Sequence, residues 1–165
     1  ARGVKGRAEV VPVPADYTVL IDYAHSPDGI INILKAVKGF AKGRVIALFG
    51  CGGDRDKTKR PLMGKAAAEL ADFCIVTSDN PRTEDPRAII EDILPGMKGI
   101  ATPMAGIDDR RAAIVYALEN AQPGDVVVLM GKGHETYQEI CGVKHHLDER
   151  EEVAAYFAAK DKAKQ

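Results

Sequence analysis

Polar residues follow apolar stretches at four places in the chain, and their types could bind a small charged ligand. The polar groups cover residues 22–28, 50–60, 79–84 and 131–135. If each apolar stretch is a strand of one parallel sheet, these groups all lie at the carboxyl edge of that sheet. Open α/β sheets bind their ligands at this edge. The sequence therefore predicts one cleft built from four separate segments.

Three charged residues in these groups indicate what the cleft could hold. Arg55 and Arg82 carry guanidinium groups, which bind carboxylates through pairs of parallel hydrogen bonds. Glu135 carries a carboxylate, which accepts hydrogen bonds from an ammonium group. Two cations and one anion together complement an amino acid.

Taken singly, the polar residues also have local explanations. His25 precedes an expected helix and could cap it, and Asp79 could form an Asx turn beside the common turn dipeptide at 80–81. Lys132 and His134 stand between or beside glycines, where polar side chains are ordinary loop residues. Only the combination of groups favours a binding site.

The segment GCGGDRDKTKR at residues 50–60 combines three glycines with six charges. Its backbone could turn sharply and bring amides close to an anion, although a tight turn followed by solvated charges is the alternative. It is not a phosphate-binding P-loop, because no glycine stands directly before Lys57-Thr58. It is not a dinucleotide fingerprint either, because Arg55 occupies the place of the last glycine.

Strands are expected to alternate with helices along most of the chain. The apolar stretches predict strands at 18–21, 45–49, 73–77, 100–104 and 125–130, and a hairpin at 137–140 and 143–147. Caps and apolar periodicity predict helices at 27–38, 61–70, 85–94, 108–120 and 148–159. The helix at 108–120 is expected to turn Ile114, Val115 and Leu118 inward. The predicted fold class is α/β, a Rossmann-like, doubly wound, mostly parallel sheet with a C-terminal hairpin and helix.

Composition limits the classes of function. The 165 residues fit one domain, and 23 basic against 24 acidic residues give no field that would attract nucleic acid or an anionic membrane. The sequence contains no apolar run of the ~20 residues that a membrane span requires. It has three cysteines without a CxxC spacing, so no disulfide framework and no metal site are expected. A cytoplasmic location is expected, and a start at Ala1 without methionine suggests a piece of a longer protein.

Four ordered motifs resemble the C-terminal domain of the Mur ligases. They are DYAHSPD at 22–28, GCGGDRDKTKRPLM at 50–63, SDNPRTEDP at 78–86 and GKGHETYQ at 131–138. GRAE at 6–9 is similar to the junction with the preceding domain in that family. The resemblance covers essentially the whole chain and is greatest to members that add meso-diaminopimelate.

The resemblance implies an ATP-dependent amide ligase of peptidoglycan synthesis. In this family ATP phosphorylates the D-glutamate carboxylate of UDP-N-acetylmuramoyl-L-alanyl-D-glutamate, and the amine of meso-diaminopimelate attacks the acyl phosphate. The implied meso-diaminopimelate-binding residues are Arg55, Asp79, Asn80, Pro81, Arg82, Gly131 and Glu135. The implied ATP-facing residues are Asp22, Tyr23 and His25, with His25 as the candidate catalytic base. Lys57 and Lys59 could support the anionic cleft.

The family also implies a division into domains. Residues 1–13 are expected to link to a missing central ATPase domain, 14–160 to form the Mur ligase C-terminal domain, and 161–165 to be a disordered tail. ATP and Mg²⁺ are expected to bind mainly to the missing N-terminal and central domains, so the isolated domain should be inactive. The alternatives are a lysine-adding ligase, a cyanophycin or folylpolyglutamate synthetase domain, or a non-catalytic amino-acid-binding module.

Overall fold

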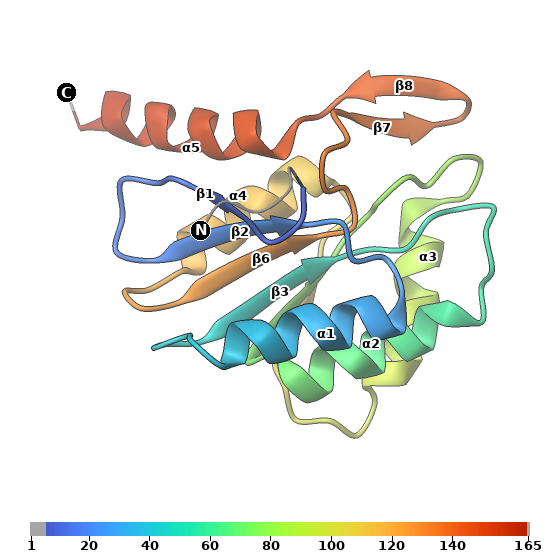
Figure 1. The fold of residues 1–165 in the computed structure, drawn as a ribbon. Coiled ribbons are helices and arrows are strands. Elements are labelled where there is room, and N and C mark those ends of the chain that lie inside the picture. The colour runs from blue at the N-terminus through green and yellow to red at the C-terminus, as the bar shows by residue number, and fades with distance from the viewer. Residues whose placement is uncertain (1–5, 165) are drawn as a thin grey trace.

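A six-stranded sheet in the order β1-β2-β6-β3-β4-β5 forms the centre of the computed structural model, which describes residues 6–164 (Figure 1). All neighbouring strands are parallel except β1, which runs antiparallel to β2. The predicted mostly parallel sheet is therefore confirmed. The strands are β1 (Glu9–Val11), β2 (Thr18–Asp22), β3 (Val45–Phe49), β4 (Phe73–Val76), β5 (Met104–Gly106) and β6 (Val126–Met130).

Helices cover both faces of the sheet, as the doubly wound prediction requires. Helices α1, α2 and α3 pack on one face, and α4 and α5 pack on the other (Figure 1). The C-terminal hairpin of β7 and β8 lies outside this sheet. The remaining elements are α1 (Pro27–Lys38), α2 (Lys59–Leu70), α3 (Pro86–Ile93), the 3-10 helix η1 (Leu94–Met97), α4 (Arg110–Asn120), β7 (Tyr137–Ile140), β8 (Val143–His146) and α5 (Glu149–Ala163).

The central strands are apolar throughout because both of their faces are covered. All five residues of β3 and all five of β6 are buried. Side chains alternate along a strand, so Ala47 and Phe49 face α1 and α2 while Ile46 and Leu48 face α4. Helices thus pack on both faces of these strands, and this packing fixes the positions at which the polar loops begin.

Side-chain caps set the beginnings of several helices. The Ser26 hydroxyl accepts a hydrogen bond from the Gly29 N–H at 3.1 Å, and Asp85 and Asp109 cap α3 and α4 in the same way. Helix α2 starts at Lys59, two residues before the predicted start at Pro61. Proline is tolerated in the first turn because its nitrogen needs no partner there.

Three sequence predictions about the elements are wrong in detail. Strand β5 begins at Met104 rather than residue 100, and Pro103, which has no N–H, directly precedes it. Val115 is 40% exposed, because the inward face of α4 follows Ala113, Ile114, Ala117 and Leu118. Residues 161–163, expected in a disordered tail, continue α5, whose last turn is rich in the helix formers alanine and lysine.

The N-terminal segment belongs partly to the sheet. The short extended segment Glu9–Val11, which the sequence predicts as either part of the linker 1–13 or an edge strand, pairs with β2 as an edge strand. The Glu9 carboxylate also accepts hydrogen bonds from Arg150 at 2.6 and 2.8 Å, which joins the segment to α5. The first five residues of that linker lie outside the described residues.

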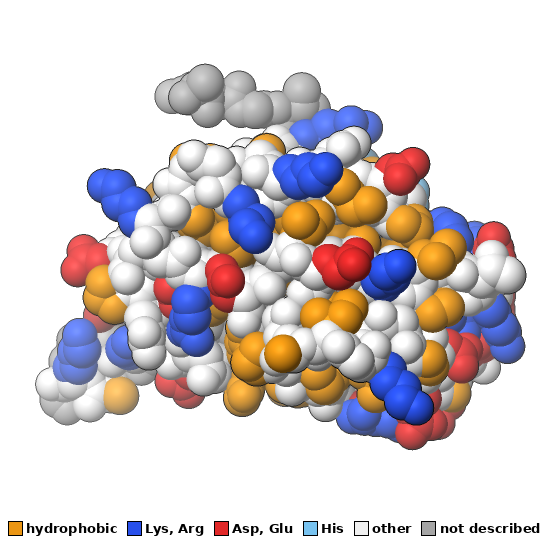
Figure 2. All heavy atoms as spheres, turned by 90° about the horizontal axis from the view of Figure 1, so that it is seen from below, with side chains coloured by type: hydrophobic (Ala, Val, Ile, Leu, Met, Phe, Trp, Pro, Cys, Tyr) orange, Lys and Arg blue, Asp and Glu red, His pale blue; other side chains and the backbone are white. Residues whose placement is uncertain are grey.

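The outer surface on the side of α1 and α2 mixes apolar and charged groups. Figure 2 shows hydrophobic side chains interspersed with basic and acidic ones on this face. Phe40 and Leu62 are both more than half exposed. Within residues 6–164, no helix is long and apolar enough to cross a membrane.

Candidate functional site

A cavity of about 450 Å³ lies at the carboxyl edge of the sheet, where the loops after β2, β3, β4 and β6 meet. The predicted convergence of four segments on one cleft is therefore confirmed. Arg55, Arg82 and Glu135 all border this one cavity. The full lining is Tyr23, His25, Gly50, Cys51, Gly52, Arg55, Asp56, Lys59, Met63, Asp79, Asn80, Arg82, Gly131 and Glu135.

Two of the candidate residues lie behind the cavity instead of lining it. Pro81 is buried, and its carbonyl oxygen would be only 1.9 Å from a Cβ placed on Gly53. Asp22 accepts hydrogen bonds from the N–H groups of Ala8 and Ala24 at 2.7 and 2.8 Å. Both residues support the backbone of the site from outside the cavity.

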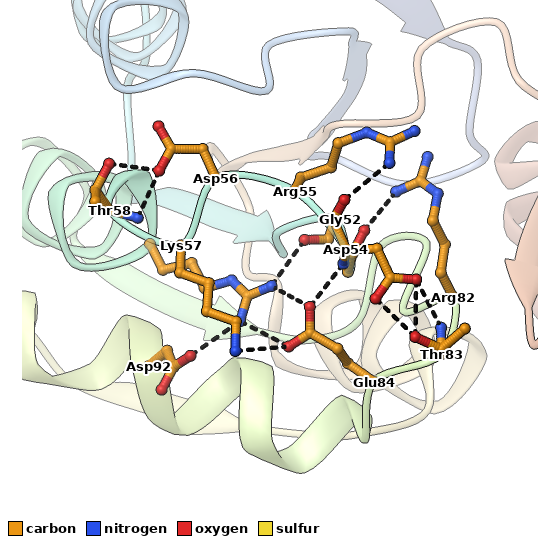
Figure 3. Close-up of polar contacts among 12 residues, drawn as sticks. Gly52, Asp54, Arg55, Asp56, Lys57, Thr58, Arg82, Thr83, Glu84 and Asp92 are labelled. Carbon is orange, nitrogen blue, oxygen red and sulfur yellow. Dashed lines mark hydrogen bonds and ion pairs between the residues drawn. The ribbon is translucent and has the colours of Figure 1, made fainter.

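The glycine loop after β3 is fastened to the loop after β4. The Gly53 N–H donates to the Asn80 carbonyl at 2.8 Å. Asp54, whose φ is +55°, accepts a hydrogen bond from the Thr83 hydroxyl at 2.7 Å and donates its own N–H to Glu84 at 2.6 Å (Figure 3). The two loops that carry Arg55 and Arg82 therefore form one unit.

Arg60 donates hydrogen bonds to both loops of this unit, at Gly52 and at Glu84. Its side chain is 1% exposed and donates to both carboxylate oxygens of Glu84, at 3.1 and 2.8 Å. It also donates to the Gly52 carbonyl at 3.0 Å and to Asp92 at 2.9 Å. The hydrogen bonds from Arg60, then that from the Asp54 N–H, lower the pKa of Glu84 to about 2.

Arg55 and Arg82 flank Gly52 at the cavity wall. A Cβ on Gly52 would be 3.0 Å from Nη1 of Arg82 and 3.6 Å from Cγ of Arg55. Arg82 has a φ of +51°, and its Nη1 donates to the Gly53 carbonyl at 3.0 Å. Arg55 is exposed and donates to the Asp54 carbonyl at 2.9 Å. The site thus presents two guanidinium groups on one side.

The acidic side chains of Asp79 and Glu135 also line the cavity. Burial and then the neighbouring Asp79 raise the pKa of Glu135. Oδ1 of Asp79 is buried and has no hydrogen-bond partner among residues 6–164, and Nη1 of Arg110 is 3.9 Å away. Gly131, at a φ of +112°, leaves room for Asp79, since a Cβ there would be 3.0 Å from Oδ1. The cavity therefore carries these two carboxylates as well as the two guanidinium groups.

Buried charges beneath the cavity were missed by the sequence reasoning. Arg110 is fully buried and donates to the Ser78 and Met130 carbonyls and to Glu149 at 2.8 to 2.9 Å. An arginine at a helix start usually lies in solvent, so the sequence holds no signal for this role. Lys132 is not a solvated loop residue, since it is fully buried and donates to the Tyr137 carbonyl. Burial is the main cause that lowers the pKa of Lys132.

The two lysines proposed to support the cleft differ. Lys59 lines the cavity. Lys57 lies 3.7 Å from Glu84 with a side chain that is 67% exposed, and it is not part of the lining. Only Lys59 could therefore act directly on an anionic ligand in this arrangement.

A second cavity of about 420 Å³ adjoins the N-terminus of α1. The three candidate ATP-facing residues, Asp22, Tyr23 and His25, line it together with Arg7 and Ser26. Nδ1 of His25 is 2.9 Å from the Tyr23 carbonyl, so the ring is held locally as well. A helix N-terminus and a guanidinium suit a phosphate group. Within residues 6–164, no group of three or more His, Cys, Asp or Glu side chains is arranged to hold a metal ion.

The comparisons with known proteins agree with this geometry. Residues 6–133 match the family model "Mur ligase, glutamate ligase domain". The chain is 56% identical over 96% of its length to the UDP-N-acetylmuramoyl-L-alanyl-D-glutamate--2,6-diaminopimelate ligase of Caldanaerobacter subterraneus subsp. tengcongensis, and 54% identical over 98% to that of Synechococcus elongatus.

A solved structure of a ligase with the same name superposes with a TM-score of 0.90 at 46% identity over 98% of this chain. The chain spans about a third of the length of each of these relatives: 33% and 32% of the two sequences and 33% of the solved chain. With a family model that matches most of its length and four loops that build one site, this chain belongs to the Mur ligase family, as a glutamate ligase domain.

Proposed function

We propose that this chain is the amino-acid-binding domain of an ATP-dependent amide ligase that adds meso-diaminopimelate to UDP-N-acetylmuramoyl-L-alanyl-D-glutamate in peptidoglycan synthesis. Relatives more than 50% identical carry a name that describes this reaction. The observation that carries the proposal is the single cavity bordered by Arg55, Arg82, Asp79 and Glu135. Its charges complement an amino acid with an additional carboxylate.

Each side chain has a role in this proposal. Arg55 and Arg82 bind carboxylates of meso-diaminopimelate, while Asp79 and Glu135 accept hydrogen bonds from ammonium groups. Asn80 and Gly131 shape the cavity, and Pro81 supports it from behind. Binding in a fixed orientation brings the free amine to the acyl phosphate, which contributes to catalysis by proximity. His25 borders both cavities and is the candidate base for the amine proton.

The second cavity is proposed to face ATP. Asp22, Tyr23 and His25 border it, and Arg7 adds a positive charge. We infer that Mg²⁺ and most of the contacts to ATP belong to the N-terminal and central domains, joined through the segment before β1, and that the reaction takes place in the cytoplasm. The 165 residues alone are then inactive, and closure of the domains over ATP completes the reaction site.

A lysine-adding ligase is the main alternative, because it would bind its amino acid in the same place. Lysine lacks the second carboxylate, so one guanidinium of the pair would be left without an anion. The two arginines on one cavity wall therefore favour meso-diaminopimelate. The DNPR sequence at residues 79–82 argues against cyanophycin and folylpolyglutamate synthetase domains, and a non-catalytic module remains the alternative outside enzymes.

The test compares amino acid substrates in the complete ligase that contains this domain. Formation of the amide product and ADP is measured with meso-diaminopimelate and with L-lysine, in the unaltered enzyme and in Arg82→Lys. The proposal predicts at least tenfold higher kcat/KM for meso-diaminopimelate, and a loss of most of that preference in the variant, because lysine cannot bind a carboxylate bidentately. Equal rates for both substrates contradict the assignment, and the absence of any amide product contradicts the ligase function.

A further inference from the structure

Glu139 of β7 contacts two residues of the site through three different groups. Its N–H donates to Oδ1 of Asn80 at 2.8 Å, and its carbonyl accepts from the Arg82 N–H at 3.0 Å. Its carboxylate Oε1 lies 3.4 Å from Nε of Arg82. The hairpin of β7 and β8 therefore holds the loop that carries both site residues, and it places a negative charge beside Arg82.

The donors of the Arg82 guanidinium are divided between protein and cavity. Nε faces Glu139, and Nη1 donates to the Gly53 carbonyl at 3.0 Å. Nη2 has no hydrogen-bond partner within residues 6–164, and the side chain borders the cavity. A ligand carboxylate can therefore bind at the Nη edge while Glu139 keeps the Nε edge.

This division affects ligands with and without a second carboxylate differently. When the ligand lacks that carboxylate, Glu139 still provides Arg82 with a counter-charge, which reduces the cost of leaving the guanidinium unpaired. When the ligand has it, the Glu139 carboxylate repels the incoming anion across the guanidinium. Both effects lower the preference of the site for a ligand with a second carboxylate. Both act through the pair of Arg82 and Glu139, whose side chains are only 19% and 30% exposed.

We propose that Glu139 is a positioning residue that sets selectivity at the amino acid site by partly neutralising Arg82. It lowers the preference of the site for meso-diaminopimelate over lysine while it keeps the guanidinium in place. This inference rests on the proposed function, since it assumes that the cavity binds an amino acid. Glu139 itself does not line the cavity and acts only through Arg82.

The test measures the dissociation constants of meso-diaminopimelate and L-lysine by calorimetry with the 165-residue chain and its Glu139→Gln variant. Glutamine keeps the backbone contacts to Asn80 and Arg82 and removes only the charge. The ratio of the lysine to the meso-diaminopimelate constant should rise about three- to tenfold in the variant, and the rise should shrink at high salt.

Two further variants serve as controls. Glu69→Gln makes the same change in net charge near the end of α2, at the opposite edge of the sheet, and should leave the ratio unchanged. In an Arg82→Gln background, adding Glu139→Gln should also leave the ratio unchanged, because the residue through which Glu139 acts is gone. The ¹⁵N–¹H signal of Arg82 Nε in the ligand-free chain reports the pair directly and should shift in Glu139→Gln.

The outcomes separate the two proposals. If both amino acids bind and the ratio stays the same or falls in Glu139→Gln, the selectivity inference is wrong and the proposed function stands. An increase that persists in the Arg82→Gln background also overturns it, because Glu139 then acts by another route. If neither amino acid binds to the unaltered chain, the same titration is made with the complete ligase that contains this domain, and the absence of binding there contradicts the proposed function and overturns the selectivity inference with it.

Discussion

At the scale of single residues, the geometry of the site depends on a glycine that has no room for a Cβ atom and on two residues with positive φ angles. The glycine is Gly53, where the backbone of Pro81 occupies the space in which a side chain would begin. Asp54 and Arg82 adopt positive φ angles without being glycine, and their side chains or backbone groups are bonded to the facing loop or hairpin. Such positions persist where the surrounding contacts fix the backbone.

Replacing Gly53 with alanine should therefore separate the two loops. The added Cβ would be 1.9 Å from the Pro81 carbonyl oxygen, so backbone must move. We expect a loss of about 1–3 kcal/mol in the free energy of unfolding and at least tenfold weaker binding of meso-diaminopimelate. Urea denaturation and calorimetry measure both quantities. Gly39→Ala, at a helical φ of −66°, is the control and should change neither by much. Unaltered binding in Gly53→Ala would show that the loop geometry is unimportant.

The ion pair of Arg60 and Glu84 gives a pH-dependent contribution to stability. The folded-state pKa of Glu84 is lowered from 4.5 to about 2, so the ionised carboxylate stabilises the fold above about pH 4.5, and that contribution is lost as the pH falls towards 2. Glu84→Gln should lower the free energy of unfolding by about 1–2 kcal/mol at pH 7, after allowance for partial exposure.

The measurement for this prediction is urea unfolding of both proteins between pH 7 and pH 3. The difference between them should be constant down to about pH 4.5 and then shrink. Glu91→Gln on the exposed side of α3 is the matched control and should show no such difference. A difference that grows on acidification would contradict the assignment to Glu84.

At the scale of elements, ion pairs connect segments that are not joined to each other by the hydrogen bonds of the sheet. Arg110 at the start of α4 contacts Ser78 in the loop after β4, the last residue of β6 and the first residue of α5. Caps, apolar stretches and glycine turns predicted most helices and strands, because those signals are local. The links from Arg110 to Glu149 and from Arg150 to Glu9 join residues far apart in sequence, so no local pattern reveals them.

The Arg110 and Glu149 pair should behave as a buried ion pair. Glu149→Gln leaves the buried Arg110 guanidinium with only the more distant Asp79 carboxylate, 3.9 Å away, and should cost about 3–5 kcal/mol of unfolding free energy. Arg110→Met combined with Glu149→Met should cost less than the sum of the two single changes, because no unpaired charge remains. Denaturation of the three variants gives the coupling energy. Strictly additive losses would mean that the two side chains act independently.

At the scale of the whole molecule, the sheet brings four loops to one edge, and this could be predicted from the sequence. The alternation of strands and helices fixes the parallel arrangement, and that arrangement places Arg55, Arg82 and Glu135 together. Other features could not be predicted. The contacts of Glu139 depend on how the hairpin folds back onto the loop after β4, and the charges that act on the buried Lys132 include Arg110 of α4 and Glu149 of α5. Both features arise from packing between segments that are distant in the sequence, so no local sequence pattern predicts them.

The central claim is that these loops form a preformed acceptor site for an amino acid with a second carboxylate. Two-dimensional NMR titration of the 165-residue chain with meso-diaminopimelate, with L-lysine and an Arg82→Ala variant in parallel, tests it most directly. The account predicts shifts at Arg55, Asn80, Arg82 and Glu135 that are strong for meso-diaminopimelate and lost in the variant. Equal shifts with both amino acids, or shifts confined to residues outside the cavity, would contradict it.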